Sequence, residues 1–151
     1  VLLMTYEWGY RYGPPMAVAP ADKVEEVVSY AVTRIPPGKI LLGLPNYGYD
    51  WPLPFVKGET EAESLSVAGA LDRARETGAV IEFDPVGQAP YFYYRKGETE
   101  HTVWFESAGS AEAKLRLVED FGLAGVSLWN VMKTNQALCQ TLNGREEIAD
   151  P

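Results

Sequence analysis

The chain has 151 residues, a formal net charge of −8 and a hydrophobic content of 46%. This length and apolar content predict a globular domain with a hydrophobic core and argue against wholesale disorder. The acidic balance argues against nucleic acid or an anionic membrane surface as a partner, because both are bound by clustered Lys and Arg. No apolar run approaches the roughly 18 residues of a membrane span. The single cysteine, Cys139, leaves no intrachain disulfide.

The chain opens on a short apolar run, Val1 to Met4, that leads into Tyr6, Glu7 and Trp8. A run this short predicts a strand buried on both faces, as in a parallel sheet under helices. Polar and aromatic groups at the C-terminal end of such a strand are typical of a site in α/β folds. Because a natural N-terminus is rarely a buried strand, we expect a chain that starts inside a fold.

Further strands of the same kind are expected along the chain, with helices between them. The strands are residues 39–44, followed by Asn46 and Tyr47, and residues 124–130, which end in Trp129 and Asn130. The helices are residues 21–34, 110–121 (with Ser110 as N-cap) and 135–142, and residues 145–151 form a polar tail. The alternation of strand and helix at these lengths predicts right-handed parallel crossovers.

The middle of the chain has a different pattern. Thr60 and Glu63 have the spacing of a capping box, so we expect a helix from Thr60 to Thr77 that Gly78 ends. Short strands are expected at residues 80–83, 91–94 and 102–105, with a hairpin turn at 96–100 between the last two. This pattern predicts a compact α+β insertion with antiparallel pairing. The single histidine, His101, lies beside the hairpin, so we expect it at the surface.

The parallel-type strands each end in Tyr or Trp, but they do not make a complete sheet. A closed β/α barrel has eight strands and about 250 residues, and the chain would supply about three-eighths of one. We therefore expect an α/β fold, the C-terminal portion of a (β/α)8 TIM barrel with an α+β insertion before the last barrel strand. The predicted division is a barrel segment at 1–50, the insertion at 51–107 and a second barrel segment at 108–151.

The strand ends carry motifs of a known family. Met4-Thr5-Tyr6-Glu7 resembles the Met-x-Tyr-Asp strand end of family 18 glycoside hydrolases, the chitinase class. Gly43-Leu44-Pro45-Asn46-Tyr47-Gly48 resembles the Gly-x-Pro-x-Tyr-Gly strand that follows, and Val126-Ser127-Leu128-Trp129 resembles the final strand. The tracts at 90–94 and 103–106 look most like the bacterial spore-germination branch, which cleaves cortex peptidoglycan.

Two departures from the family pattern matter. The family's Asp-x-x-Asp-x-Asp-x-Glu motif, whose Glu is the general acid, does not occur in this chain. Glu7 stands where many chitinases have Asp, although the spore branch tolerates Glu there. The resemblance therefore implies a hydrolase whose acid lies outside these residues, and we expect the chain alone to have no turnover.

The resemblance implies substrate-assisted, retaining hydrolysis of β-1,4-linked N-acetylglucosamine polymers. It implies Tyr6 as the catalytic residue that holds the N-acetyl group, with Trp129 beneath the sugar ring. Glu7 would hydrogen-bond sugar hydroxyls, while Met4 and Tyr47 would shape the pocket. Without the resemblance, a strand-end Tyr or Trp is more often core packing, and Glu7 is equally compatible with a solvated loop carboxylate.

The expected partner is a polysaccharide, either peptidoglycan or chitin, and no cofactor or metal site is expected. The resemblance places the parent protein outside the cell, in the cell wall or spore envelope. Two alternatives stay open. One is a non-catalytic, chitinase-like carbohydrate-binding module that keeps its aromatic platforms. The other is a structural half-barrel that forms a homo-oligomer to cover its exposed sheet edges.

Overall fold

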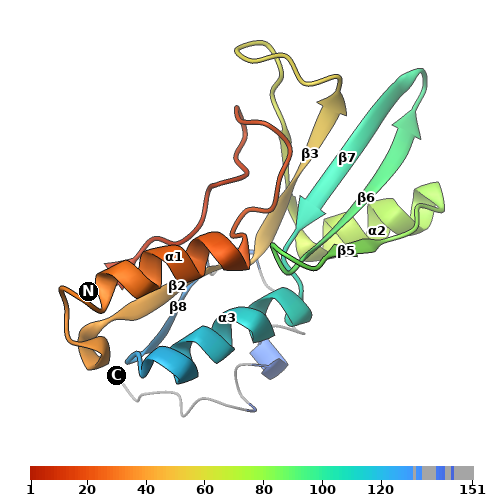
Figure 1. Cartoon of the computed structure of the whole chain (residues 1–151). Helices are drawn as coiled ribbons and strands as arrows, with labels where there is room; N and C mark the ends of the chain where they lie inside the picture. Colours follow the sequence, from red (N-terminus) through yellow and green to blue (C-terminus); the bar gives the residue numbers. More distant parts are fainter. Residues whose placement is uncertain (131, 134–138, 142–143, 145–151) are drawn as a thin grey trace.

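The computed structural model describes residues 1–130, 132–133, 139–141 and 144 (Figure 1). Within them, a parallel sheet has the order β1-β2-β8 and an antiparallel sheet has the order β4-β3-β7-β6-β5. The strands are β1 (Leu2–Leu3), β2 (Leu41–Pro45), β3 (Tyr47–Leu53), β4 (Glu63–Ser66), β5 (Glu82–Asp84), β6 (Ala89–Lys96), β7 (Thr99–Phe105) and β8 (Gly125–Trp129). The helices are α1 (Ala21–Ala31), α2 (Val67–Thr77) and α3 (Ala108–Phe121), with a 3-10 turn at Pro37–Lys39.

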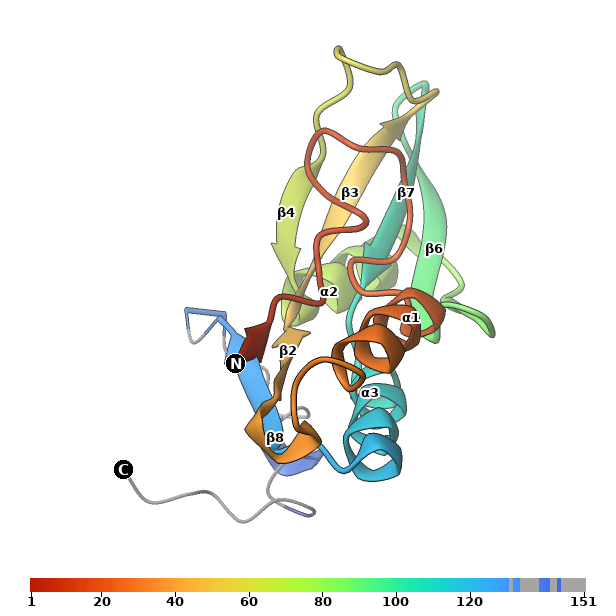
Figure 2. The same ribbon diagram turned by 60° about the vertical axis from the view of Figure 1, so that its left-hand side comes forward.

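The parallel sheet confirms the predicted pattern of strand, helix and strand. Leu3 pairs with Leu42, and Leu42 pairs with Val126 on its other side. Helices α1 and α3 cover one face of this sheet (Figure 2). Leu42 packs with Val24 and Val28 there, because alternate residues of a strand point to the same face. Leu41 points to the opposite face and is 38% exposed among the described residues.

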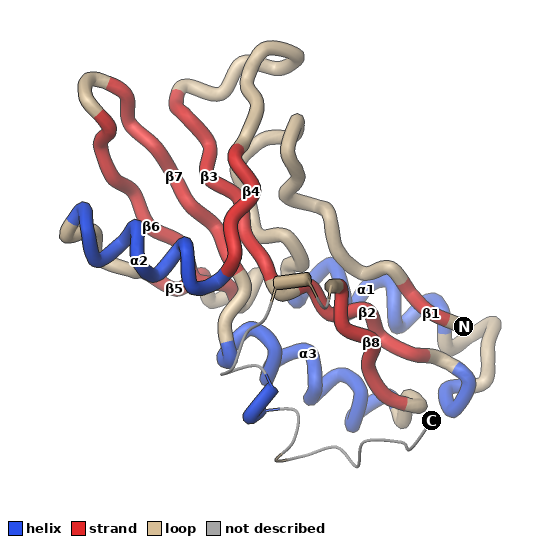
Figure 3. The backbone as a smooth tube through the Cα atoms, turned by 180° about the vertical axis from the view of Figure 1, so that it is seen from behind, coloured by secondary structure: helices blue, strands red, loops and turns tan. Residues whose placement is uncertain are grey.

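The antiparallel sheet is covered on one face by α2, as the view from behind shows (Figure 3). Phe92, Val103 and Phe105 form the core beneath that helix. A loop at residues 9–19 covers part of the other face, where the Trp51 indole N–H donates to the Gly13 carbonyl at 2.8 Å. The predicted hairpin is confirmed, since β6 and β7 pair on either side of residues 97 and 98.

The helix expected from Thr60 is wrong in its first part. Residues 63–66 form β4, which pairs with β3, and the helix begins only at Val67. Ser66 is the N-cap, and its hydroxyl accepts from the Gly69 N–H at 3.0 Å. The Thr60 hydroxyl instead accepts from the Val56 N–H. Pairing with β3 satisfies the backbone of residues 63–66, so it overrides the capping-box spacing, while the predicted end at residue 78 is confirmed.

Two other boundaries differ from prediction. Helix α3 has Ser107 as its N-cap, and Ser107 and Ser110 close a reciprocal capping box, so the expected cap was three residues late. Strand β3 begins at Tyr47, within a stretch that was expected to be a polar strand end. The predicted limit at residue 50 therefore lies inside β3, and the division into three segments stays a prediction. The helix expected at 135–142 falls largely, and the tail at 145–151 wholly, outside the described residues.

Candidate active site

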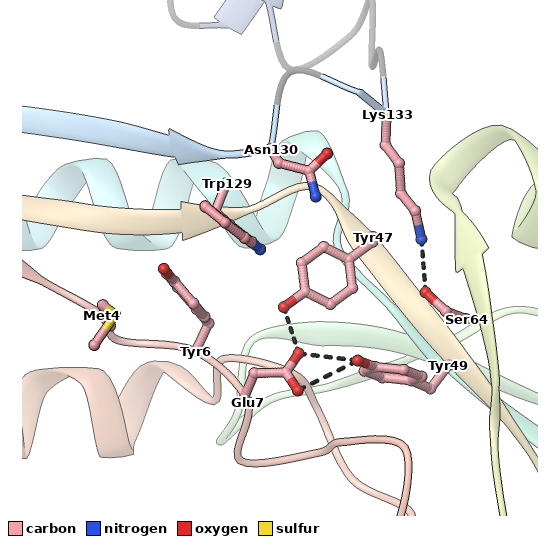
Figure 4. A pocket seen from close by; sticks show the side chains of 9 residues that line it. All are labelled: Met4, Tyr6, Glu7, Tyr47, Tyr49, Ser64, Trp129, Asn130 and Lys133. Atoms are coloured by element: carbon pink, nitrogen blue, oxygen red, sulfur yellow. Dashed lines mark hydrogen bonds between the residues drawn. The ribbon is translucent and has the colours of Figure 1, made fainter.

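A pocket of about 430 Å³ lies where the two sheets meet (Figure 4). The chain passes through Asn46 directly from β2 into β3, so ends of both sheets contribute to this pocket. It is lined by Met4, Tyr6, Glu7, Tyr47, Tyr49, Ser64, Trp129, Asn130 and Lys133. The structure thus brings together all five residues proposed from the sequence, Met4, Tyr6, Glu7, Tyr47 and Trp129. The role of each stays a prediction.

The other lining residues were missed by the sequence analysis. Tyr49 is two residues after Tyr47 on β3, so the two side chains share one face of the strand, which is a usable signal. Ser64 lies opposite Tyr49 on β4, and that pairing is known only from the structure. Lys133 follows the last strand of the sheet, and no motif in the sequence marks it.

Tyr6 is held against the bare backbone of Gly43. The Thr5 hydroxyl, which is buried, donates to the Gly43 carbonyl at 3.0 Å and fixes the chain just before Tyr6. A Cβ atom at residue 43 would lie 2.5 Å from the Leu3 carbonyl oxygen and 2.8 Å from Tyr6 Cε1. The Tyr6 and Trp129 ring centres lie 6.3 Å apart with an interplanar angle of 11°. Glycine at 43 is therefore required for this ring arrangement.

We expect Gly43→Ala to lower the free energy of unfolding by about 1–3 kcal/mol, because the added methyl group overlaps backbone as well as the Tyr6 ring. Urea denaturation measures the loss, and near-ultraviolet circular dichroism reports the displaced ring. Gly38→Ala is the matched control, since nothing lies within 4 Å of a Cβ built there. Equal stability of the two variants would show that residue 43 has room for a side chain.

Glu7 is exposed, but its carboxylate is held by two tyrosines. The Tyr47 hydroxyl donates to Glu7 Oε1, and the Tyr49 hydroxyl lies 3.0 Å from Oε1 and 3.3 Å from Oε2. Burial, together with the Glu7 charge, raises the pKa of both Tyr47 and Tyr49. Both tyrosine hydroxyls therefore stay protonated and act as donors. The Glu7 backbone is left-handed, with φ of 68°. These contacts favour a fixed carboxylate in the pocket over a freely solvated loop side chain.

Asn46 joins the end of β8 to the junction between the sheets. Its backbone N–H donates to the Trp129 carbonyl at 3.1 Å. Its side-chain amide donates to the Asn130 carbonyl at 2.8 Å and to the Lys133 carbonyl, and its side-chain oxygen accepts from the Asn130 N–H at 2.9 Å. Because Asn46 is buried, these bonds are shielded from water. Asn46 is a positioning residue for Trp129 and Lys133.

Lys133 is the only cationic side chain among the described residues that line the pocket. Its ammonium donates to the Ser64 hydroxyl at 2.6 Å and lies 5.3 Å from the centre of the Tyr47 ring. Burial lowers the pKa of Lys133, and the charge of Glu7 partly offsets that effect. No group of three or more His, Cys, Asp or Glu side chains in the described residues is placed to hold a metal ion.

Comparison with known proteins decides the family. The family model described as glycosyl hydrolases family 18 matches residues 1–133. The chain belongs to glycosyl hydrolase family 18. A relative within this family is the cortical fragment-lytic enzyme of Bacillus subtilis (strain 168), which is 46% identical over 132 residues; the alignment covers 87% of this chain and 31% of the relative.

Solved family 18 structures match the fold as well. The spore cortex-lytic enzyme SleL of Bacillus cereus is 38% identical with a TM-score of 0.95, over 98% of this chain and 34% of that one. A chitinase from Chromobacterium violaceum ATCC 12472 is 31% identical with a TM-score of 0.86, over 94% of this chain and 44% of that one. The resemblance drawn from the strand-end motifs is confirmed. The match covers 31% of the curated relative, so this chain spans about a third of that relative's length.

Proposed function

We propose that the chain is the C-terminal part of a glycosidase that cleaves β-1,4-linked N-acetylglucosamine polymers, with cortex peptidoglycan as the first candidate and chitin as the second. The observation that carries this proposal is the convergence of four side chains on one pocket of a family 18 chain: Tyr6 and Glu7 after β1, Tyr47 at the start of β3 and Trp129 at the end of β8. The names of the cortical fragment-lytic and spore cortex-lytic relatives support a cortex substrate. A location in the cell wall or spore envelope is part of the same proposal.

We infer that the remaining strands of a TIM barrel complete the parallel sheet. Within the described residues, β1 and β8 each pair on one side only. Parallel sheets with open edges and an open apolar face are unusual, and Leu2 and Leu41 on the open face are 47% and 38% exposed. The curated relative has about two thirds of its length outside the match, enough for the missing strands. Those strands would carry the general acid.

The residues of this chain would position the substrate rather than protonate it. In substrate-assisted hydrolysis the N-acetyl oxygen bonds to the anomeric carbon as the bond to the leaving oxygen breaks. The acid outside this chain gives the leaving oxygen its proton, and water then opens the cyclic intermediate with retention. Tyr6 would hold the N-acetyl group in line, and such positioning contributes up to several kcal/mol. Trp129, which is 53% exposed, offers a surface for the apolar face of the sugar.

The test compares two forms of the protein on defined glycans. Expressed at the full length that its gene encodes, it should release reducing ends from cortex fragments or from chitooligosaccharides, with the anomeric configuration retained. Residues 1–151 alone should release none, because they lack the acidic motif. Binding without any release by the full-length protein would favour the non-catalytic alternative. Neither binding nor release would reject a glycan-directed function.

In the described part of the chain every helix is too short or too polar to cross a lipid bilayer.

A self-associated half-barrel is the remaining structural alternative, and light scattering on residues 1–151 distinguishes it. A monomer would be inconsistent with assembly through the open edges of β1 and β8.

A further inference from the structure

The positive charge in the pocket is not neutralised in the way that other buried charges of the chain are. Lys114 forms an ion pair with Glu106 at 2.9 Å, with side-chain exposures of 0% and 3%. Arg73 pairs with Asp50, whose side chain is 2% exposed. The half-buried Lys133 has a hydroxyl partner instead, and no carboxylate of the described residues forms an ion pair with it. Among the partly or fully buried Lys and Arg side chains of the described residues, which are Lys23, Arg73, Lys114 and Lys133, only Lys133 has no carboxylate partner.

The contacts around Lys133 also keep the nearest pocket carboxylate from serving as its partner. Figure 4 shows the Glu7 carboxylate bonded to the hydroxyls of Tyr47 and Tyr49, while the Lys133 ammonium is bonded to Ser64. The Asn46 side-chain amide donates to the backbone carbonyl of Lys133 and so fixes the backbone there. An ammonium group has three N–H donors, and the Ser64 hydroxyl takes one of them, so two have no hydrogen-bond acceptor among the described residues.

We propose that Lys133 binds a carboxylate carried by the glycan, so that the pocket favours an acidic polymer over a neutral one. This inference rests on the proposed function and names the substrate class of the same site. In peptidoglycan the lactyl group of N-acetylmuramic acid carries a free carboxylate only where no stem peptide is attached, and a stem peptide carries carboxylates of its own, whereas chitin carries none. Charge-assisted hydrogen bonds are shorter and stronger than neutral ones, which makes the preference measurable.

The experiment measures kcat/KM of the full-length protein on three matched glycans. The first is a peptide-free muramyl glycan, the second is the same glycan with its lactyl carboxylate reduced to an alcohol, and the third retains its stem peptides. We expect the peptide-free acidic glycan to be preferred over the reduced one by about tenfold, which corresponds to about 1.4 kcal/mol. A preference seen only with stem peptides would place the recognised carboxylate on the peptide.

Variants of Lys133 test whether its side chain causes the preference for the acidic glycan. Lys133→Met should remove it, and Lys133→Arg should retain most of it because the charge remains. Lys57→Met is the matched control, since it removes one positive charge from an exposed turn and should leave the preference unchanged. Raising the salt concentration should also weaken the preference in the unsubstituted protein.

Three outcomes would overturn the assignment. Equal rates on all three glycans in the unsubstituted protein would do so without any variant. An equal loss on both glycans in Lys133→Met would make Lys133 a general pocket residue. A preference that survives Lys133→Met would place the recognition elsewhere. No turnover of any glycan rejects the proposed function itself, and the inference about Lys133 with it, so the two failures are distinguishable.

Discussion

Replacing Tyr6 by Phe lowers kcat of the full-length protein by at least tenfold, or about 1.4 kcal/mol of transition-state stabilisation. The variant keeps the ring that lies against Gly43 and near-parallel to Trp129, and it removes only the hydroxyl. No hydrogen bond to a described residue occupies that hydroxyl, so it is available to hold the N-acetyl group of a substrate. Steady-state kinetics on a glycan substrate give the effect, and circular dichroism verifies the fold.

The control for this result is Tyr12→Phe. Tyr12 is 58% exposed, and its ring contacts Arg11 rather than the pocket, so its hydroxyl should not affect the rate. An unchanged kcat for Tyr6→Phe would remove Tyr6 from the reaction and leave it a packing residue.

Replacing Asp50 by Ala should lower the free energy of unfolding by about 3 kcal/mol, because three polar side chains lose their contacts with a buried carboxylate. Asp50 Oδ2 accepts from the Tyr94 hydroxyl at 2.6 Å and from the Arg73 guanidinium. Asp50 Oδ1 lies 2.8 Å from His101 Nδ1. Urea denaturation gives the change, with the slope checked to confirm that the unfolding transition stays two-state.

Glu63→Ala is the matched control for this change, because Glu63 is the other carboxylate bound to Arg73. Its side chain is 57% exposed, so its loss should cost at most about 1 kcal/mol. Asp50→Asn keeps one acceptor oxygen and should fall between the two. Similar costs for Asp50→Ala and Glu63→Ala would show that the buried network around Asp50 contributes no more than a surface ion pair.

The same network explains one expectation that was wrong. His101 was expected at the surface because it lies near a hairpin, but its side chain is only 14% exposed and is paired with Asp50. Strands β3 and β7 pair so that residue 101 lies opposite Pro52, two positions from Asp50. This contact depends on the register of strands distant in sequence, and local composition carries no information about that register.

Local signals predicted the parallel sheet well. Short apolar runs gave β2 and β8, and the helix expected at residues 21–34 contains α1. The larger failures of prediction came where pairing between distant segments decided the outcome. Residues 63–66 form a strand because β3 offers them partners, although Thr60 and Glu63 suggest a helix start.

The candidate site divides in the same way. Tyr6, Tyr47 and Trp129 were found because they stand at strand ends within recognisable motifs. Ser64 is placed in the pocket by the pairing of β4 with β3, and Lys133 is placed there by the Asn46 hydrogen bonds. Neither contact can be predicted from the local sequence. These two pocket residues could therefore be identified only from the structure.

The most direct test is a crystal structure of the full-length protein with an N-acetylglucosamine oligosaccharide bound. We predict a sugar ring over Trp129, its N-acetyl group within hydrogen-bond distance of the Tyr6 hydroxyl, and further strands of a closed barrel paired with β1 and β8. A sugar bound away from these residues, or a structure in which other elements fill the pocket, would contradict the proposal.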